Sequence, residues 1–160
     1  MRLNLLLIIL LRLLVPPSSD AQSADSANFG KASSSRNMIA SVHPLATDAG
    51  IDAFKRGGNA VDAAIATAVT LGVVDGYNSG IGGGCFILIR KPDQTLIAID
   101  GREMAPQAAH RDMYLKNGKP IPLASQVGSL AVGVPGALAA YNRAIQDHGN
   151  LLFEDVIRPA

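Results

Sequence analysis

Residues 79–101 read SGIGGGCFILIRKPDQTLIAIDG, and they predict a glycine loop followed by a β-hairpin. Two short runs rich in Ile and Leu are bounded by residues that break regular structure, and the turn at Pro92 and Asp93 is short enough to make them antiparallel neighbours. The run from Phe86 to Ile89 is apolar at every position. Such continuity is typical of a strand buried on both faces, so we expect helices on both sides of this sheet.

The sequence before the hairpin predicts a short strand and then a helix. The apolar run of residues 38–42 is expected to be the buried strand. In residues 43–59, Pro44 suits a first helical turn, and Gly57 with Gly58 supplies a left-handed stop. The apolar positions that would share one face of this helix are Leu45, Ala49 and Ala53 or Phe54.

A second helix is predicted to begin at once. Asn59 is a favourable N-cap, and Asp62 lies three positions on, as the acidic residue of a capping box does. The stripe expected to face the core contains small residues that allow close packing: Val61, Ala64, Ile65, Ala68, Val69 and Gly72.

The sequence after the hairpin is mainly irregular until residue 136. We expect short helical turns over residues 105–115, a loop over 117–126 and a buried segment over 129–136. Residues 136–150 then predict an amphipathic helix that ends at Gly149 and turns Leu138, Tyr141 and Ile145 inward, and residues 151–159 predict one more.

Composition indicates a globular protein with a core of small aliphatic side chains. Hydrophobic residues make up 48% of the 160 positions, but aromatic residues only 4%, and tryptophan is absent. The formal net charge is +1, without a basic block, which excludes the electrostatic footprint of nucleic-acid binding.

The amino terminus has the features of an export signal. Residues 1–15 contain Arg2 and a leucine-rich run too short to span a bilayer, and Ser19 with Ala21 fits cleavage before Gln22. We therefore expect a signal peptide over residues 1–21, a flexible leader over 22–36, and a periplasmic or secreted protein. The alternatives are an uncleaved anchor that leaves the protein on the extracellular face of a membrane, and a mistaken start codon.

Few residues are obvious candidates for a catalytic, metal-binding or cofactor-binding role. The three histidines lie at no metal-ligand spacing, and we expect neither a metal site nor a cofactor. The glycines before Cys85 do not fit a dinucleotide fingerprint, because they precede a strand instead of following one. For Cys85, the single cysteine, we favour a small apolar role over that of a nucleophile.

Arg102 is the most informative charged residue, because it lies where the second strand ends. Its guanidinium offers a planar fork that matches a carboxylate. From the residues alone, a solvated ion pair with Asp100 or Glu103 is the better interpretation.

Taken together, four segments resemble γ-glutamyltransferases (γ-glutamyltranspeptidases): GGNAVDAAIATAV (57–69), SGIGGGCFILIR (79–90), DGREMAPQAA (100–109) and VGVPGALAAY (132–141). Their order and spacing match the beginning of that family's large subunit, so residues 37–160 are interpreted as its N-terminal portion. The resemblance implies an α+β fold, part of the αββα sandwich of N-terminal nucleophile hydrolases, incomplete in this chain.

The resemblance also implies an activity and its partners. The donor is glutathione or another γ-glutamyl compound, and the acceptor is water, an amino acid or a peptide. Arg102 matches the arginine that holds the α-carboxylate of the γ-glutamyl group, which reverses the interpretation as a surface pair. Glu103 is interpreted as structural.

The nucleophile of the family is a threonine exposed when a precursor cuts itself, and the resemblance places it outside these 160 residues. Thr47, Thr67, Thr70 and Thr95 all lie inside predicted helices or a strand. We therefore expect this chain to need the rest of the large subunit and the small subunit for activity. The alternatives are a truncated inactive or binding protein, or another acylase of the same family.

Overall fold

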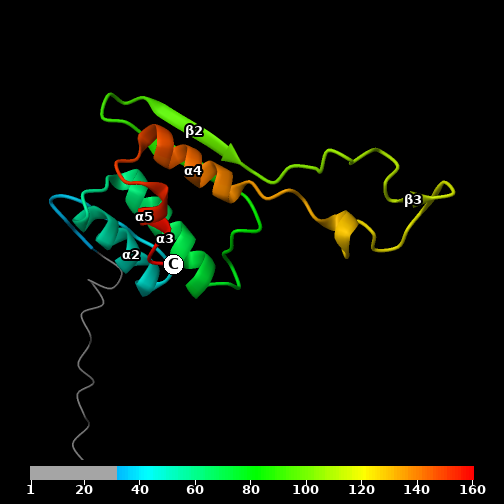
Figure 1. The fold of residues 1–160 in the computed structure, drawn as a ribbon, viewed down its shortest axis with the longest axis horizontal. Coiled ribbons are helices and arrows are strands. Elements are labelled where there is room, and N and C mark those ends of the chain that lie inside the picture. The colour runs from blue at the N-terminus through cyan, green and yellow to red at the C-terminus, as the bar shows by residue number, and fades with distance from the viewer. Residues whose placement is uncertain (1–31) are drawn as a thin grey trace, which may run out of the picture. The chain divides into compact units, whose positions relative to one another are not determined.

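The computed structural model describes residues 32–160, and residues Ser35–Ala160 form one compact unit. Its elements follow the chain in the order α2 (Pro44–Lys55), α3 (Ala60–Val74), β1 (Cys85–Arg90), β2 (Leu96–Gly101), β3 (Leu115–Lys116), β4 (Lys119–Pro120), a 3-10 turn (Ser129–Ala131), α4 (Ala137–His148) and α5 (Phe153–Ile157). Figure 1 shows the four helices packed together beside the hairpin, with the segment that carries β3 and β4 extending away from them.

The predicted signal peptide, residues 1–21, lies outside the described residues, as does the leader up to residue 31. Residues 32–36 are exposed and have no regular structure. Within the described part of the chain, none of the helices is both long and apolar enough to cross a bilayer.

The helix α2 forms where its local signals predict. His43 is the N-cap, and its Nδ1 accepts a hydrogen bond from the N–H of Leu45 at 3.3 Å. Gly57 ends the helix with a φ of 89°, a left-handed conformation that favours glycine. Leu45, expected on the inner face, is instead 58% exposed.

The strand expected over residues 38–42 does not form. Met38 is 55% exposed and Val42 is 81% exposed. A strand needs a hydrogen-bonding neighbour, and β1 and β2 pair only with each other in the described sheets. The segment is held instead by side chains, since the hydroxyls of Ser41 and Thr47 lie 2.8 Å apart.

The helix α3 is the centre of the core. Asn59 and Asp62 form the expected capping box. Ile65 and Val69 are buried as predicted, but Ala64 is exposed, and the buried surface extends to Ala63. The reason is that α3 contacts α2, α4 and α5, so its buried surface is wider than one stripe.

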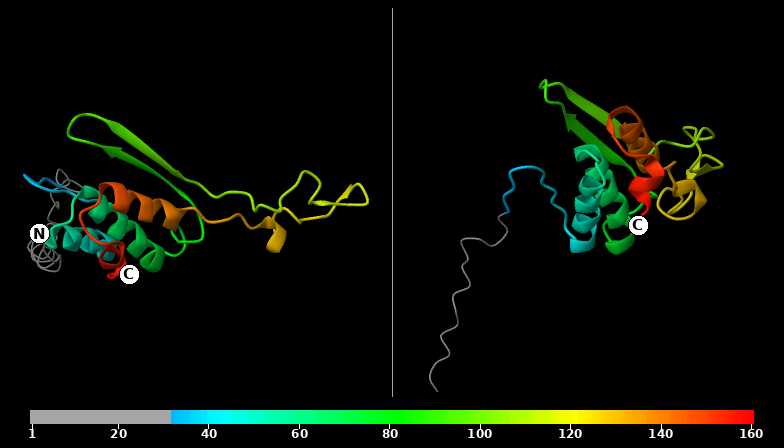
Figure 2. Two further views of the ribbon diagram at one scale, coloured as in Figure 1. Left: turned by 45° about the horizontal axis from the view of Figure 1, so that its top comes forward. Right: turned by 60° about the vertical axis from the view of Figure 1, so that its left-hand side comes forward.

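The predicted hairpin is confirmed. β1 and β2 are antiparallel, with Cys85 opposite Gly101 and Arg90 opposite Leu96. Figure 2 shows both strands beside α4, and α4 contacts both of them.

The expectation that both faces of the hairpin are buried is wrong for the described residues. The side chains of Ile87 and Ile99 pack against the core, whereas Phe86 and Leu88 are 66% and 70% exposed. Exposure therefore alternates along both strands, because the helices of the described chain cover one face.

The core consists mainly of alanine with a few larger aliphatic side chains, as the composition predicts. Its buried members are Ala53, Ala63, Ile65, Ala66, Val69, Ala137, Tyr141, Ala144, Ile145 and Val156. Val156 of α5 is fully buried, and complete burial of a valine contributes roughly 1.5 to 3 kcal/mol. The short helix α5 is thereby anchored on α3 and α4.

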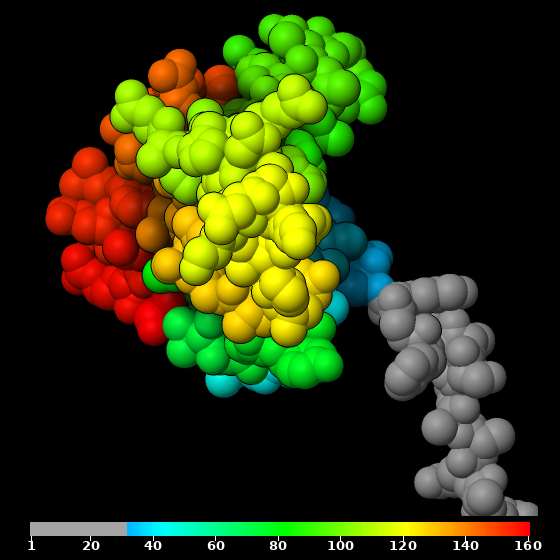
Figure 3. Space-filling model, turned by 90° about the vertical axis from the view of Figure 1, so that its right-hand side faces the viewer, coloured from blue at the N-terminus to red at the C-terminus, as the bar shows by residue number. Residues whose placement is uncertain are grey.

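Residues 105–133 form an arm. Turns at residues 107–108 and 111–114 agree with the short turns expected there, but the segment expected to be buried is largely exposed, with Val132 at 63% and Val134 at 50%. The view in Figure 3 looks at the molecule from the side on which the arm lies. At its base, Met104 and Val134 form an antiparallel bridge that closes the arm as a loop.

Candidate functional site

Arg102 lies at the carboxyl end of β2, in backbone that is fixed on both sides. Its own N–H donates to Oδ1 of Asp100 at 2.9 Å. Two residues on, the N–H of Met104 donates to the carbonyl of Val134 at 3.1 Å, and the N–H of Val134 donates back at 2.8 Å. The Cα of Arg102 is therefore well positioned, while its side chain is exposed.

Two glycines allow other segments to approach this backbone closely. A β-carbon on Gly84 would lie 2.7 Å from the carbonyl oxygen of Gly101 and 2.8 Å from the Cα of Arg102. A β-carbon on Gly136 would contact the same Gly101 oxygen and lie 2.7 Å from the carbonyl oxygen of Arg102. The glycine loop and the start of α4 thus converge on residues 101 and 102, and a side chain at either position would push them apart.

The glycine loop also satisfies the beginning of α4. The carbonyl of Gly83 accepts hydrogen bonds from the N–H groups of Gly136 at 3.1 Å and Ala137 at 3.2 Å. Free N–H groups at a helix start otherwise need a partner. The loop therefore has a structural role at the start of α4.

The guanidinium of Arg102 has no partner among the described residues. Among residues 32–160, ion pairs join Arg56 with Asp52, Arg143 with Asp147 and Arg158 with Asp155, and none includes Arg102. The surface pair with Asp100 or Glu103 that the residues alone favour does not form. An unpaired guanidinium on fixed backbone is available to a carboxylate ligand.

A cavity of about 310 Å³ lies beside Arg102. Its wall includes Asp100 and Arg102 at the end of β2, Met104 at the base of the arm, and Gly136 and Arg143 of the α4 segment. The ionisable side chains on this wall are two arginines and one aspartate, and Arg143 is paired with Asp147. Sequence reasoning missed Arg143, because it lies on a different element from Arg102.

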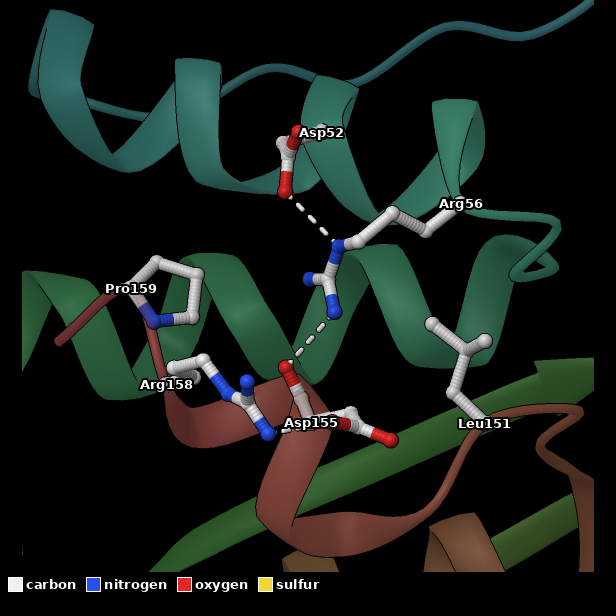
Figure 4. Close-up of a pocket in the computed structure, with 6 residues that line it drawn as sticks. All are labelled: Asp52, Arg56, Leu151, Asp155, Arg158 and Pro159. Carbon is white, nitrogen blue, oxygen red and sulfur yellow. Dashed lines mark hydrogen bonds and ion pairs between the residues drawn. The ribbon is translucent and has the colours of Figure 1, made fainter.

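A larger cavity, of about 510 Å³, lies between α2 and α5 and is also lined by two arginines. As Figure 4 shows, both are engaged with neighbouring groups. Nε of Arg56 donates to Asp52 at 2.7 Å and Nη1 to the carbonyl of Asp155 at 2.8 Å, while Nη2 of Arg158 donates to the Asp155 carboxylate at 2.8 Å. Because these groups satisfy one another, the smaller cavity beside Arg102 is the better ligand site.

Glu103 lines a third cavity, of about 350 Å³, together with Ser79, Gly83 and Tyr141. Its side chain packs against two glycines, since a β-carbon on Gly83 would lie 3.3 Å from Oε1 and one on Gly133 would lie 3.3 Å from Cβ. These contacts agree with the structural role expected for Glu103.

Cys85 is half-buried at the start of β1 and packs against the core. Burial raises the pKa of its thiol. Burial also raises the pKa of the nearby Tyr141 hydroxyl, and the charge of a Cys85 thiolate would raise it further. A nucleophilic cysteine needs a lowered pKa, so these shifts favour the apolar role.

The remaining candidates have local roles or none. His43 caps α2, and the described residues contain no group of three metal-ligating side chains close enough to hold an ion. Thr67 and Thr70 are buried in α3, as expected for residues inside a helix. Thr95, expected inside the second strand, lies instead in the hairpin connection, one residue before β2.

Comparisons with known proteins identify relatives of this chain. A family model described as Gamma-glutamyltranspeptidase matches residues 46–160. The chain is similar to the glutathione hydrolase proenzyme of Escherichia coli (strain K12), with 43% identity over 126 residues, covering 78% of this chain and 22% of the relative. The chain thus spans about a fifth of the length of the curated relatives that it matches.

Solved structures agree with the sequence comparison. Helicobacter pylori gamma-glutamyltranspeptidase has a TM-score of 0.75 and 36% identity, with 81% of this chain and 38% of that chain covered. Gamma-glutamyltranspeptidase from Pseudomonas nitroreducens complexed with L-DON has a TM-score of 0.71 and 37% identity, with 79% and 38% covered. These similarities confirm the α+β fold class expected from the sequence, that of the αββα N-terminal nucleophile hydrolases.

Proposed function

The chain belongs to the gamma-glutamyltranspeptidase family, and on that premise we propose that it is part of an enzyme that transfers or hydrolyses the γ-glutamyl group of glutathione and related γ-glutamyl compounds. The observation that supports this proposal is the guanidinium of Arg102, which lines a cavity and has no partner among residues 32–160.

In this proposal Arg102 binds the α-carboxylate of the γ-glutamyl group. Arginine suits that role because its planar fork can donate two parallel hydrogen bonds to one carboxylate. The hydrogen bonds at Asp100 and Met104 hold the backbone on either side of Arg102 in place, so only the side chain has to be ordered when the substrate binds. The described residues thus supply binding and orientation.

The covalent chemistry is assigned to a threonine nucleophile outside these 160 residues. Its hydroxyl attacks the γ-carbonyl, and its own α-amine serves as the base. The resulting γ-glutamyl-enzyme is released to water, or to an amino-acid or peptide acceptor. We propose that the rest of a large subunit and a small subunit complete the enzyme, and that it acts in the periplasm or outside the cell.

The test replaces Arg102 with lysine in the protein expressed from its complete gene. Lysine keeps the charge but cannot form two parallel hydrogen bonds with one carboxylate. The KM for glutathione should rise about tenfold or more, because a hydrogen bond to a charged group contributes roughly 1.5 to 3 kcal/mol and about 1.4 kcal/mol corresponds to tenfold.

The matched control is Arg158→Lys, since Arg158 is an exposed arginine paired with Asp155 at the other cavity. Its KM should stay at the wild-type value. An unchanged KM in Arg102→Lys would remove Arg102 from the binding site. Preferential turnover of a cephalosporin side-chain amide or of poly-γ-glutamate would instead assign the chain to another acylase of the family.

A further inference from the structure

We infer that Asp100 is a positioning residue for Arg102: its carboxylate holds the turn that follows β2 and, because it is engaged there, forms no ion pair with the guanidinium. This inference rests on the proposed function, because it takes Arg102 to bind the carboxylate of the substrate. It adds a second residue on which substrate affinity depends, and this residue acts through Arg102.

Residues 102 and 103 lie between two stretches of paired backbone. β2 ends at Gly101, and the chain is next paired at Met104, at the base of the arm. Among the residues that the structure describes, the backbone of residues 102 and 103 makes one hydrogen bond, in which the N–H of Arg102 donates to Oδ1 of Asp100 at 2.9 Å. Asp100 is therefore the residue that holds this turn by hydrogen bonding.

The hydrogen bond between Asp100 and Arg102 depends on an oxygen at the right distance. It is an Asx turn, in which the side chain of an aspartate or asparagine accepts from the N–H two residues further along the chain. Asparagine can make it through its amide oxygen, alanine has no acceptor, and glutamate is longer by one methylene group. The role inferred for Asp100 therefore needs its oxygen and does not need its charge.

Two acidic residues flank Arg102, and neither pairs with its guanidinium. Side chains two residues apart on an extended chain lie on the same side, and Asp100 and Arg102 do line the same cavity. Glu103 lines a different cavity, beside Tyr141. An ion pair with Asp100 would compete with the substrate carboxylate for the guanidinium. The bond from Asp100 to the backbone therefore helps to keep Arg102 available.

The same hairpin contains a second aspartate with the same local hydrogen bond. Just before β2 begins, Oδ1 of Asp93 accepts from the N–H of Thr95 at 2.9 Å, and Asp93 is exposed, as Asp100 is. Asp93 lies in the turn between the strands and does not line the cavity beside Arg102. The two aspartates share a hydrogen-bond geometry and differ in the residue that they hold, so Asp93 is a matched control.

The experiment measures kcat and KM for glutathione with the protein expressed from its complete gene. Asp100→Ala should raise KM about two- to tenfold, as the loss of one hydrogen bond implies, because Arg102 is then displaced for part of the time. The change in kcat should be smaller, since the turn contributes to binding and not to the covalent step. Asp93→Ala should leave both values at those of the wild type.

Two further substitutions separate the oxygen of Asp100 from its charge. Asp100→Asn keeps the acceptor, so KM should remain at the wild-type value or fall below it, because the amide does not repel the substrate carboxylate. Asp100→Glu keeps the charge on a longer side chain that can reach the guanidinium, so KM should rise at least as much as in Asp100→Ala. Amide hydrogen exchange at Arg102 should be faster in Asp100→Ala than in Asp100→Asn or the wild type.

The outcomes separate this inference from the proposed function. A wild-type KM in Asp100→Ala, an equal rise in Asp100→Asn, or an equal rise in Asp93→Ala would each overturn the role of Asp100. Arg102→Lys tests the proposed function by itself, because the backbone N–H remains. If Arg102→Lys raises KM and Asp100→Ala does not, only the inference fails. If Arg102→Lys leaves KM unchanged, the assignment of Arg102 fails and the role of Asp100 fails with it.

Discussion

Asp62 at the start of α3 and Arg102 at the end of β2 are both charged residues at the end of an element, but their surroundings are opposite. Asp62 is fully buried, and its carboxylate accepts from the N–H groups of Asn59, Asn150 and Leu151 at 2.7 to 3.2 Å. Arg102 is exposed and its guanidinium has no partner in residues 32–160. A buried charge whose bonding capacity is filled stabilises the fold, whereas an exposed, unpaired charge on fixed backbone is available to a ligand.

The largest expected effect comes from Asp62→Ala. Three part-buried backbone N–H groups would lose their acceptor, which costs about 1 to 3 kcal/mol for each group that water does not reach. The free energy of unfolding should fall by about 3 to 5 kcal/mol, measured by denaturant titration of the protein expressed from its complete gene.

The control for Asp62 is Asp52→Ala, which removes a half-exposed carboxylate from an ion pair with Arg56. It should cost less than about 1 kcal/mol. Similar losses in the two variants would show that Asp62 is no more structural than a surface carboxylate.

Gly136→Ala should lower both the stability of the fold and the affinity for the substrate. Its β-carbon would contact the carbonyl oxygens of Gly101 and Arg102, and forcing extra volume into a packed contact costs typically about 1 to 3 kcal/mol. The backbone of Arg102 would also shift, so the KM for glutathione should rise together with the loss of stability.

Gly76→Ala is the matched control, because its β-carbon would meet nothing within 4 Å. Stability and KM should both stay close to wild type. Wild-type behaviour of Gly136→Ala would show that close approach at Arg102 is not required.

Arg102→Ala should separate stability from function. The exposed side chain makes no hydrogen bond or ion pair with the described residues, so unfolding should change by less than about 0.5 kcal/mol. A thermal melt measures the stability and a glutathione titration the affinity. A large drop in melting temperature would make Arg102 a structural residue like Asp62.

The smallest effect is expected at Asp93, an exposed carboxylate in the turn between β1 and β2. It accepts from the N–H of Thr95 at 2.9 Å, and this hydrogen bond is the main reason that the pKa of Asp93 is lowered. A pKa below that of the unfolded chain means that the contribution to stability is present above the unfolded pKa and is lost as the pH falls through the folded pKa.

This contribution is measured by comparing the melting temperatures of Asp93→Asn and the wild type from neutral to acidic pH. The wild type should be slightly more stable at neutral pH, and the difference should vanish below the lowered pKa. A difference that is independent of pH would assign the effect to the turn geometry instead of the charge.

Local chemistry made several elements predictable. Pro44 and Gly57 delimit α2, Asn59 and Asp62 cap α3, and Gly149 ends α4, as the residues indicate. Each of these signals acts within a few residues of the chain, so no knowledge of distant contacts is needed.

Predictions that required a distant partner failed. Residues 38–42 are apolar enough for a strand but have no neighbouring strand among the described residues. Phe86 and Leu88 are apolar enough for burial, yet the described helices cover only the other face of the hairpin. Arg143 could not be connected with Arg102, because their elements meet only through the packing of α4 against β2.

The sequence by itself determined the helix limits, the hairpin and the alanine-rich core. Through the resemblance it also indicated the family and the proposed role of Arg102. Tertiary structure alone decided which strand face is covered, that the guanidinium of Arg102 forms no ion pair with Asp100 or Glu103, and that Arg143 lines the same cavity. The physical reason is range: caps and turns depend on neighbouring residues, whereas burial and charge pairing depend on segments that meet only after folding.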